Sequence, residues 1–428
     1  MVVVGLGKRE RLDAEKLRRA AAVGHNRIKG LGVTELVVLP PETAKLDIEP
    51  REQAQVITEG IALAAYEFKK YKSSNGEPKP RLERVHLVAD GDKSREAMAD
   101  GARRGDIFAR AVCFARNLVN EHPEVCTPVY LAQKSQETVR GQKDMTIKVI
   151  DEKQARKLGM GGLIGVSLGS DEPPRFVHMT YKAPGAKKTI AICGKGITFD
   201  SGGLCIKPAD GMLNMKDDMS GAAAVIGIFQ GLREFKPKVN VHGIFAATEN
   251  MPGDGAYKTR DVLRAMNGKT MEIINTDAEG RVVLSDALSY ASRLKPDQII
   301  DLATLTGACV VALGPEISGI FGTDPSLINN LIAAGRSTGE KIWQLPLEEE
   351  YFEMIKSDVA DMKNSGGRWG GSITAALFLK EFVDPGISWA HVDIAGPALV
   401  ESNKPYMPAG GTGVMVRTLL RYLEAQAR

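Results

Sequence analysis

The sequence predicts an α/β protein with two αβ domains. Apolar, strand-like runs alternate with amphipathic helical patterns along the 428-residue chain, which is typical of βαβ units and largely parallel sheets. A chain of this length exceeds the usual size of one domain. A long helical pattern over 93–120 lies between two αβ sections. We therefore place the boundary near residue 100, with an N-terminal domain at 1–100 and a larger domain at 101–428.

The smaller N-terminal section is expected to alternate strands with helices. Its predicted strands are 2–5, 35–40 and 84–90, and its predicted helices are 13–24 and 52–71. The segment KSSNGEPKP at 72–80 combines glycine, proline and polar residues, which predicts a loop.

The larger section repeats the alternation with more strongly buried patterns. Its predicted strands are 189–194, 239–247, 297–307 and 389–396, and its predicted helices are 219–235, 284–296 and 414–426. Pro296 is expected to end the second of these helices.

Composition excludes several classes of protein. The chain has 56 basic and 53 acidic residues, a net charge of +3, which is too close to neutral to indicate nucleic-acid binding. No run approaches the roughly 18 apolar residues of a membrane span, and the N-terminus does not resemble a secretion signal. The five cysteines have no CxxC spacing. Free thiols in a reducing cytoplasm are therefore expected, without membrane association.

Three blocks of polar residues follow apolar runs. They are GKGITFDSGG at 194–203 with Lys207 shortly after, MKDDMSG at 215–221, and NTDAEGR at 275–281. Strand ends on one edge of a parallel sheet bring such blocks together. The blocks therefore predict one polar site at the strand ends.

The carboxylates of these blocks indicate metal chemistry. Asp277 and Glu279 are two residues apart and would point the same way in an extended segment, with Asp200 and Asp218 nearby. Four converging carboxylates repel one another, and they can hold two divalent cations, with Lys195, Lys207 and Arg281 balancing the charge. Each acid taken alone could instead cap a helix. Together they predict a hydrolytic two-metal site, with peptide and phosphoester substrates both open.

A second hydrolase hypothesis rests on Ser167. Gly165–Gly169 matches GxSxG, and His242 or His391 could act as a base. A nucleophile elbow needs a helix directly after the serine, and Pro173 and Pro174 argue against one. A glycine-rich strand end is the favoured interpretation of this segment, and satisfied histidines in strands are favoured for His242 and His391.

The motifs resemble those of the leucyl aminopeptidase family, also called cytosol aminopeptidases. NTDAEGR at 275–281 matches the family signature. Further matches in order and spacing are GKGITFDSGG at 194–203, IKP at 206–208, KDDMSGAAAV at 216–225, ENMP at 249–252 and DLATLTGA at 301–308. The resemblance covers about three quarters of the chain, and it implies a mixed sheet sandwiched by helices in the larger domain, with a dinuclear metal site at the strand ends.

The resemblance also implies how each residue acts. One metal would be held by Asp200, Asp277 and Glu279, and the other by Lys195, Asp200, Asp218 and Glu279. The Asp277 main-chain carbonyl would add a ligand. A water bridging the two metals would attack the N-terminal peptide bond. Lys207 would polarise the carbonyl, and Arg281 would hold a bicarbonate ion that serves as general base. The matching substrate-binding positions are Met215, Thr304, Leu305 and Gly307.

The same resemblance sets expectations about substrate, metals and assembly. Peptides with a free N-terminus are expected, with Leu- or Met-like residues preferred beside the apolar Met215 wall. Zn²⁺ or Mn²⁺ would fill the sites, and Mg²⁺ or Co²⁺ is compatible. A homohexamer is implied. Some relatives bind DNA, which we do not expect here. The chain departs from the family at GDGAYKTRDV (253–262), and its section before Lys195 is shorter than in most members.

Overall fold

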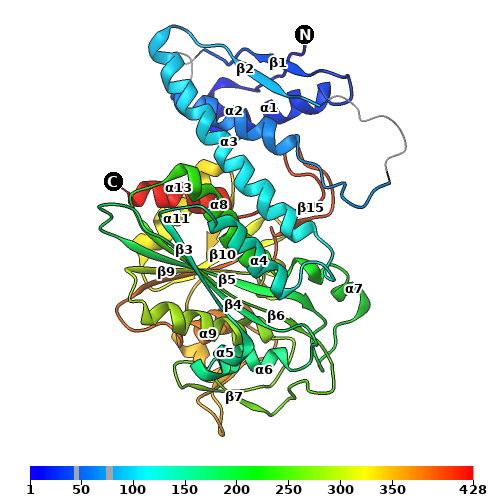
Figure 1. Cartoon of the computed structure of the whole chain (residues 1–428), viewed down its shortest axis with the longest axis vertical. Helices are drawn as coiled ribbons and strands as arrows, with labels where there is room; N and C mark the ends of the chain where they lie inside the picture. Colours follow the sequence, from blue (N-terminus) through cyan, green and yellow to red (C-terminus); the bar gives the residue numbers. More distant parts are fainter. Residues whose placement is uncertain (43–47, 74–80, 428) are drawn as a thin grey trace.

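The computed structural model describes residues 1–42, 48–73 and 81–427. A small N-terminal layer lies at one end of a larger body, and the long helix α3 joins them (Figure 1).

The α-helices are α1 (Ala14–Ile28), α2 (Pro50–Ala64), α3 (Asp92–Asn120), α4 (Pro128–Val139), α5 (Glu152–Leu158), α6 (Gly161–Ser167), α7 (Ala209–Met212), α8 (Ser220–Phe235), α9 (Glu279–Arg293), α10 (Gly307–Leu313), α11 (Pro325–Thr338), α12 (Gly371–Lys380) and α13 (Val416–Gln426). Short 3₁₀ turns are η1 (Arg9–Arg11), η3 (Met215–Asp217) and η4 (Glu349–Ile355).

Most strands belong to one central sheet. The strands are β1 (Glu35–Val38), β2 (Arg84–Leu87), β3 (Met145–Ile150), β4 (Arg175–Tyr181), β5 (Thr189–Asp200), β6 (Asn240–Asn250), β7 (Val262–Arg264), β8 (Thr270–Glu272), β9 (Gln298–Ala303), β10 (Ile317–Gly322), β11 (Lys341–Gln344), β12 (Met362–Lys363), β13 (Ser388–Asp393), β14 (Leu399–Val400) and β15 (Gly410–Gly411). Among the described residues the central sheet has eight strands, in the order β11-β10-β13-β9-β5-β6-β4-β3.

The central sheet is mixed. β13, β9, β5 and β6 run parallel, whereas β10 is antiparallel to β13, and β4 is antiparallel to both β6 and β3. The parallel block puts the carboxyl ends of β5, β6 and β9 at one edge. The expected mixed sheet between helices is confirmed.

Helices cover both faces of this sheet. Alternate residues of β5 enter separate cores: Ile190 and Ile192 face one, and Ala191 and Cys193 face the other. The first core is closed by residues of α3, α4, α8, α11 and α13, and the second by residues of α6, α9 and α12 (Figure 1). Because both faces are buried, residues 190–193 of β5 form a continuous apolar run before the polar block begins.

The N-terminal layer pairs β1 with β2 in parallel and packs them on α1 and α2. The strand predicted at 2–5 is wrong, since residues 1–8 form no strand and Val3 is exposed. The helix predicted at 52–71 ends earlier, at Ala64, because the next segment turns to bind α3. There, the Tyr66 hydroxyl donates a hydrogen bond to Asn117 at 2.9 Å.

Two predictions concern the joint between the sections. The long helix predicted over 93–120 is confirmed as α3. Residue 100 lies inside this continuous helix, and we keep it as the proposed domain boundary. In the predicted loop 72–80, residues 72–73 are irregular, and residues 74–80 lie outside the described residues. In the described part of the chain, no helix is both long and apolar enough to cross a membrane.

Candidate active site

The predicted site residues lie where the parallel strands end. Lys195 is inside β5, and Asp200 is its last residue. Asp218 follows η3 and stands just before α8. Glu279 is the first residue of α9, and Asp277 lies in the turn before it. The structure therefore brings four acids from three separate blocks to one edge of the sheet.

The local conformation at 277–279 differs from the prediction. The extended segment expected there is wrong. The Asn275 side chain accepts a hydrogen bond from the Asp277 main-chain nitrogen at 3.0 Å, which closes a turn. α9 then begins at Glu279 rather than at 284. The turn and the helix start, not strand alternation, bring the two carboxylates to the same side.

Three of the acids form a tight cluster. One carboxylate oxygen from each of Asp200, Asp277 and Glu279 lies within 4.8 Å of the other two. Asp200 and Glu279 are buried, and Asp277 is partly exposed. Hard divalent cations prefer such oxygen ligands. The cluster therefore has the donor type and spacing of a metal site.

Two lysines offset part of the negative charge of these acids. Lys195 Nζ lies 2.7 Å from Asp218 Oδ2 and 2.9 Å from Glu279 Oε1. Lys207 Nζ lies 2.8 Å from Asp200 Oδ2 and 2.5 Å from Asp277 Oδ1. Each lysine thus bridges two carboxylates, so all four acids have a cationic partner.

Burial strongly affects how the site holds protons. It raises the pKa of Asp218 well above its usual range, and it raises the pKa of Glu279 to about 7, with the charge of Asp200 adding to the effect. Burial would lower the pKa of Lys195, but the carboxylates of Asp218 and Glu279 raise it above its ordinary value. A dication at this position would favour the ionised carboxylates and the neutral amine.

Glycines make room for the Lys195 side chain and for the start of α8, the helix that follows Asp218. A Cβ atom on Gly280 would lie 2.5 Å from Lys195 Cε. A Cβ atom on Gly221, at the start of α8, would lie 2.2 Å from the Leu302 carbonyl oxygen. Only glycine permits these two approaches without a shift of the neighbouring atoms.

Arg281 differs from the two lysines because no carboxylate among the described residues is paired with it. Its Nη1 donates a hydrogen bond to the Asn364 carbonyl oxygen at 3.0 Å, and its buried Nε has no hydrogen-bond partner among the described residues. Burial lowers the pKa of Arg281 to about 10. This buried cation has an unused hydrogen-bond donor and can therefore bind a small anion.

The four predicted substrate residues lie around the same edge. Thr304 Oγ1 donates a hydrogen bond to Asp218 Oδ1 at 2.7 Å, and the Thr304 carbonyl accepts one from Lys195 at 3.1 Å. The Leu305 nitrogen donates to Asp393 at 3.2 Å. Gly307 begins α10 and faces open space, and Met215 begins η3 directly before the Asp218 block.

The serine-hydrolase hypothesis finds no support in the geometry. Ser167 is the last residue of α6, so the predicted strand end is wrong. Its buried hydroxyl donates a hydrogen bond to the Ile164 carbonyl at 2.8 Å rather than to a histidine. His391 Nδ1 lies 2.6 Å from Asp301 and His242 Nδ1 lies 2.9 Å from His178, and both histidines are in strands, as predicted. His391 is not fully satisfied, however, because its buried Nε2 has no hydrogen-bond partner among the described residues.

Comparisons with known proteins agree with this geometry. The family model described as "Cytosol aminopeptidase family, catalytic domain" matches residues 113–420, and that family's N-terminal domain model matches 1–75. The chain belongs to the cytosol aminopeptidase family. It is therefore a metal-dependent aminopeptidase, a hydrolase of peptides.

Individual relatives of this family cover nearly the whole chain. The "Probable cytosol aminopeptidase" of Aquifex aeolicus is 48% identical over 98% of this chain and 84% of the relative. That of Geobacter sulfurreducens is 46% identical over 100% and 85%. The bottromycin maturation enzyme BotP in complex with Mn is 37% identical, with a TM-score of 0.91 over 99% and 90%. A mutant tomato leucine aminopeptidase is 35% identical, with a TM-score of 0.87 over 96% and 79%.

Three residues that the sequence analysis did not single out support the site of this cytosol aminopeptidase-family chain. Asn250, at the end of β6, donates hydrogen bonds to Asp200 Oδ1 at 2.8 Å and to the Thr276 carbonyl at 3.0 Å. The Tyr257 hydroxyl donates to the same carbonyl at 2.7 Å. Asn364 holds the main chain at 274–275. Asn250 lies in the matched ENMP motif, whereas no strand-end pattern marks Asn364.

Proposed function

We propose that the chain removes the N-terminal residue of peptides with two divalent metal ions, preferring Leu- or Met-like residues. The observation that carries this proposal is the buried acidic cluster of Asp200, Asp277 and Glu279, whose ligand atoms lie within 4.8 Å of one another. Membership in an aminopeptidase family assigns peptides rather than phosphoesters to that cluster.

The donor set fits two metals. Asp200, Asp277 with its main-chain carbonyl, and Glu279 would hold one ion. Lys195, Asp218, Asp200 and Glu279 would hold the other, with the last two shared. The buried Glu279 Oε2, which has no hydrogen-bond partner among the described residues, supports this assignment. Lys195 already contacts Asp218 and Glu279, and it would have to lose its proton to become a ligand.

Bound metals would supply Lewis acidity, which lowers the pKa of water and polarises a carbonyl. We propose Zn²⁺ or Mn²⁺, with Mg²⁺ or Co²⁺ also accepted by these ligands. The relative BotP has been solved in complex with Mn, which supports manganese. The carboxylates and Lys195 would fix the positions of both ions.

Lys207 would stabilise the oxyanion, and Arg281 would hold the general base. Lys207 Nζ, which bridges Asp200 and Asp277, stands close enough to the cluster to stabilise the oxyanion of the attacked carbonyl. The unpartnered Nε of the buried Arg281 fits a small anion such as bicarbonate. Bicarbonate held there would supply a general base.

The substrate would lie along Met215, Thr304, Leu305 and Gly307. Gly307 is exposed and faces open space, so a peptide main chain can approach it closely. Met215 offers an apolar, adaptable wall for a Leu or Met side chain. A free α-amine bound to one metal would restrict cleavage to N-terminal residues. We further propose a homohexamer in the cytoplasm, with no DNA-binding role.

The test compares leucine p-nitroanilide with its N-acetylated analogue. Activity is measured on protein as purified, after chelation, and after Zn²⁺ or Mn²⁺ is added back. We expect hydrolysis of the free-amine substrate alone, lost on chelation and restored by metal. Cleavage of both substrates, or activity that survives chelation, would overturn the proposal.

Two variants then test the roles of individual residues. Lys207→Ala and Arg281→Ala are each expected to lower kcat by about 10²–10³-fold with metal content unchanged, because they remove charge stabilisation rather than ligands. Lys356→Ala, which removes an exposed lysine paired with Glu353, serves as the matched control.

A further inference from the structure

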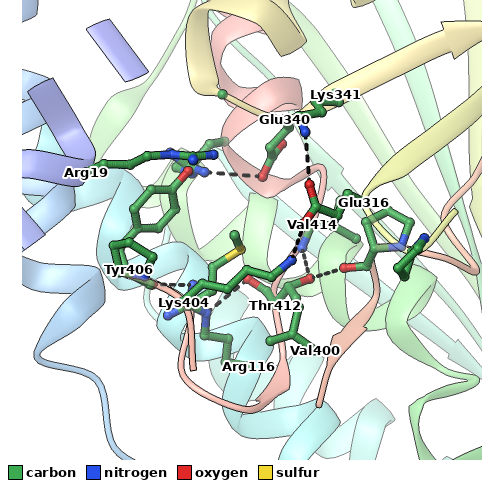
Figure 2. Close-up of a pocket in the computed structure, with 16 residues that line it drawn as sticks. Arg19, Arg116, Glu316, Glu340, Lys341, Val400, Lys404, Tyr406, Thr412 and Val414 are labelled. Carbon is green, nitrogen blue, oxygen red and sulfur yellow. Dashed lines mark hydrogen bonds and ion pairs between the residues drawn. The ribbon is translucent and has the colours of Figure 1, made fainter. Parts of the chain in front are cut away.

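A cavity separate from the acidic cluster lies between the N-terminal layer and the larger body. It has a volume of about 340 Å³ and shares no residue with the acidic cluster. Arg19 of α1 lies beside Tyr406, Arg116 of α3 lies near Thr412, and Lys341 and Lys404 both reach Glu316 (Figure 2). Its volume is at the lower end of the range for small-molecule sites.

Positive charge exceeds negative charge around this cavity. The carboxylates lining it or paired with its cations are Glu15, Glu59, Glu316 and Glu340. The corresponding cations are Arg18, Arg19, Arg116, Lys341, Lys404 and Arg417. Six cations against four carboxylates leave a surplus of two.

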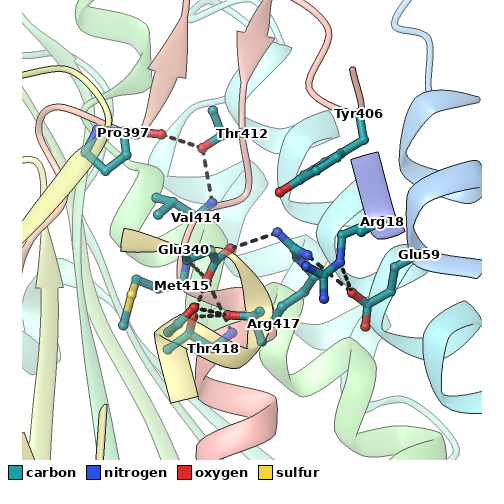
Figure 3. Close-up of polar contacts among 12 residues, drawn as sticks. Arg18, Glu59, Glu340, Pro397, Tyr406, Thr412, Val414, Met415, Arg417 and Thr418 are labelled. Carbon is teal, nitrogen blue, oxygen red and sulfur yellow. Dashed lines mark hydrogen bonds and ion pairs between the residues drawn. The ribbon is translucent and has the colours of Figure 1, made fainter. Parts of the chain in front are cut away.

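The surplus arises at Glu316, which serves two lysines, and at Arg116, which is paired with no carboxylate among the described residues. Glu316 lies 2.9 Å from both Lys341 and Lys404. Glu59, which is fully buried, lies 2.8 Å from Arg18 and 3.2 Å from Arg417 (Figure 3). Glu316 cannot neutralise both lysines, whereas Arg18 and Arg417 have further carboxylate partners in Glu15 at 2.5 Å and Glu340 at 3.7 Å.

Two buried arginines carry unused binding capacity. Arg116 is 1% exposed and has no acidic partner among the described residues; its guanidinium donates to the carbonyls of Thr412, Tyr406 and Leu63 at 3.0, 3.2 and 3.3 Å. An arginine has five N–H donors, so two remain. Arg417 is 3% exposed, and its Nε has no hydrogen-bond partner in the described part of the chain.

The other walls of the cavity are apolar. Val400, Val414, Pro315 and Met407 line it together with the Tyr406 ring. A surplus of about two charges beside an apolar wall matches a small anion with a hydrocarbon part. It does not match a polyphosphate, whose negative charge would exceed the surplus of two.

We propose that this cavity is a binding site for a small organic carboxylate, separate from the peptidase site. The carboxylate lies against the cations, with Arg19 and Lys404 contacting it at the open side, and the hydrocarbon part lies against the apolar wall. Bidentate pairing with arginine gives this recognition its specificity. The proposal does not depend on the function proposed for the metal cluster.

The test is calorimetric titration of the full chain with 4-methylpentanoate. This probe has no amine, and it is titrated into both the metal-loaded and the chelated protein, because a carboxylate can also bind metals. 4-Methylpentanamide, the uncharged isostere, and inorganic phosphate are titrated in parallel. We expect the carboxylate to bind equally to both forms of the protein and at least about tenfold more tightly than the amide or phosphate.

Variants locate the binding. Arg19→Gln combined with Lys404→Gln is expected to weaken carboxylate binding by about tenfold or more, since both side chains are partly exposed and neither is needed for packing. Lys380→Gln is the matched control: Lys380 is 33% exposed beside a glutamate, and Lys404 is 30% exposed beside Glu316. Absence of binding, equal binding of the amide or phosphate, or unchanged binding in the double variant would overturn the proposal.

Discussion

Nη1 of Arg281 donates a hydrogen bond to the main-chain oxygen of Asn364 at 3.0 Å, across 83 residues of sequence. The Asn364 side chain in turn accepts from the Ile274 nitrogen at 2.7 Å and donates to the Asn275 carbonyl at 2.7 Å. One buried residue therefore fixes both the arginine and the loop that precedes Asp277. This link connects the strand β12 region to the acidic cluster.

Asn364→Ala should loosen the loop before Asp277 while the main-chain bond to Arg281 remains available. We expect a loss of about 1–3 kcal/mol in the free energy of unfolding and a fall of about 10–100-fold in kcat/KM. Thermal unfolding and leucine p-nitroanilide hydrolysis provide the measurements. Asn267→Ala, which removes exposed turn contacts far from the cluster, is the control. Wild-type activity in Asn364→Ala would contradict this positioning role.

Gly280→Ala should displace the Lys195 side chain. Its new Cβ atom would lie 2.5 Å from Lys195 Cε, so the amine must move away from Asp218 and Glu279. We expect bound metal to fall from two ions to about one per chain, measured by elemental analysis after dialysis. Gly24→Ala, another glycine within a helix, meets only Val4 at 3.5 Å and should keep full metal content. Two retained ions in Gly280→Ala would show that Lys195 is not a ligand.

Glu59→Gln should destabilise the fold by about 3–5 kcal/mol at pH 7, because it leaves two buried arginines short of a carboxylate. Burial alone would raise the pKa of Glu59, but Arg18 and Arg417 lower it below its ordinary 4.5. A lowered pKa gives stability that is fully present above 4.5 and is lost as the pH falls through the folded-state value. The difference between Glu59→Gln and wild type should therefore shrink below about pH 4.

Urea unfolding from pH 7 down to pH 4 and below measures this difference. Glu234→Gln is the matched control, since Glu234 pairs with Arg110 at 2.7 Å on the surface and 48% of its side chain is exposed. Its effect should stay below about 1 kcal/mol. A pH-independent difference for Glu59→Gln would contradict the electrostatic explanation.

Ser167→Ala should leave peptidase activity unchanged within about twofold, because the Ser167 hydroxyl only caps the end of α6. We expect a stability loss of about 1 kcal/mol by thermal unfolding. A serine-directed inhibitor should likewise have no effect. Abolished activity in a folded Ser167→Ala protein would restore the nucleophile hypothesis.

The positions of the strand ends could be predicted because each polar block directly follows an apolar run in the sequence. β5, β6 and β9 are apolar runs that stop at polar blocks, and parallel strands necessarily end at one edge. Asp200 and Asp218 could be placed near each other for this reason. Their actual contacts with Lys207 and Lys195 needed side-chain positions that periodicity does not give.

The prediction failed where local pattern and tertiary pairing diverge. Residues 2–5 are apolar and strand-like, yet a strand needs a neighbour to complete its hydrogen bonds, and residues 1–8 form none. At 277–279 the spacing of the two acids suggested an extended segment, whereas the Asn275 turn and the start of α9 decide the conformation. At 2–5 no neighbouring strand pairs with the segment in the described part of the chain, and at 275–277 a side-chain hydrogen bond closes a turn.

The sequence by itself determined the α/β alternation, the two-sided burial of β5 and the polar blocks with their family resemblance, because these are written in residue type and spacing. Only the tertiary structure decided that Asn250 and Asn364 hold the site and that Arg116 is buried with no acidic partner among the described residues. Those relationships join residues far apart in sequence. Their energies depend on burial, which no local pattern encodes.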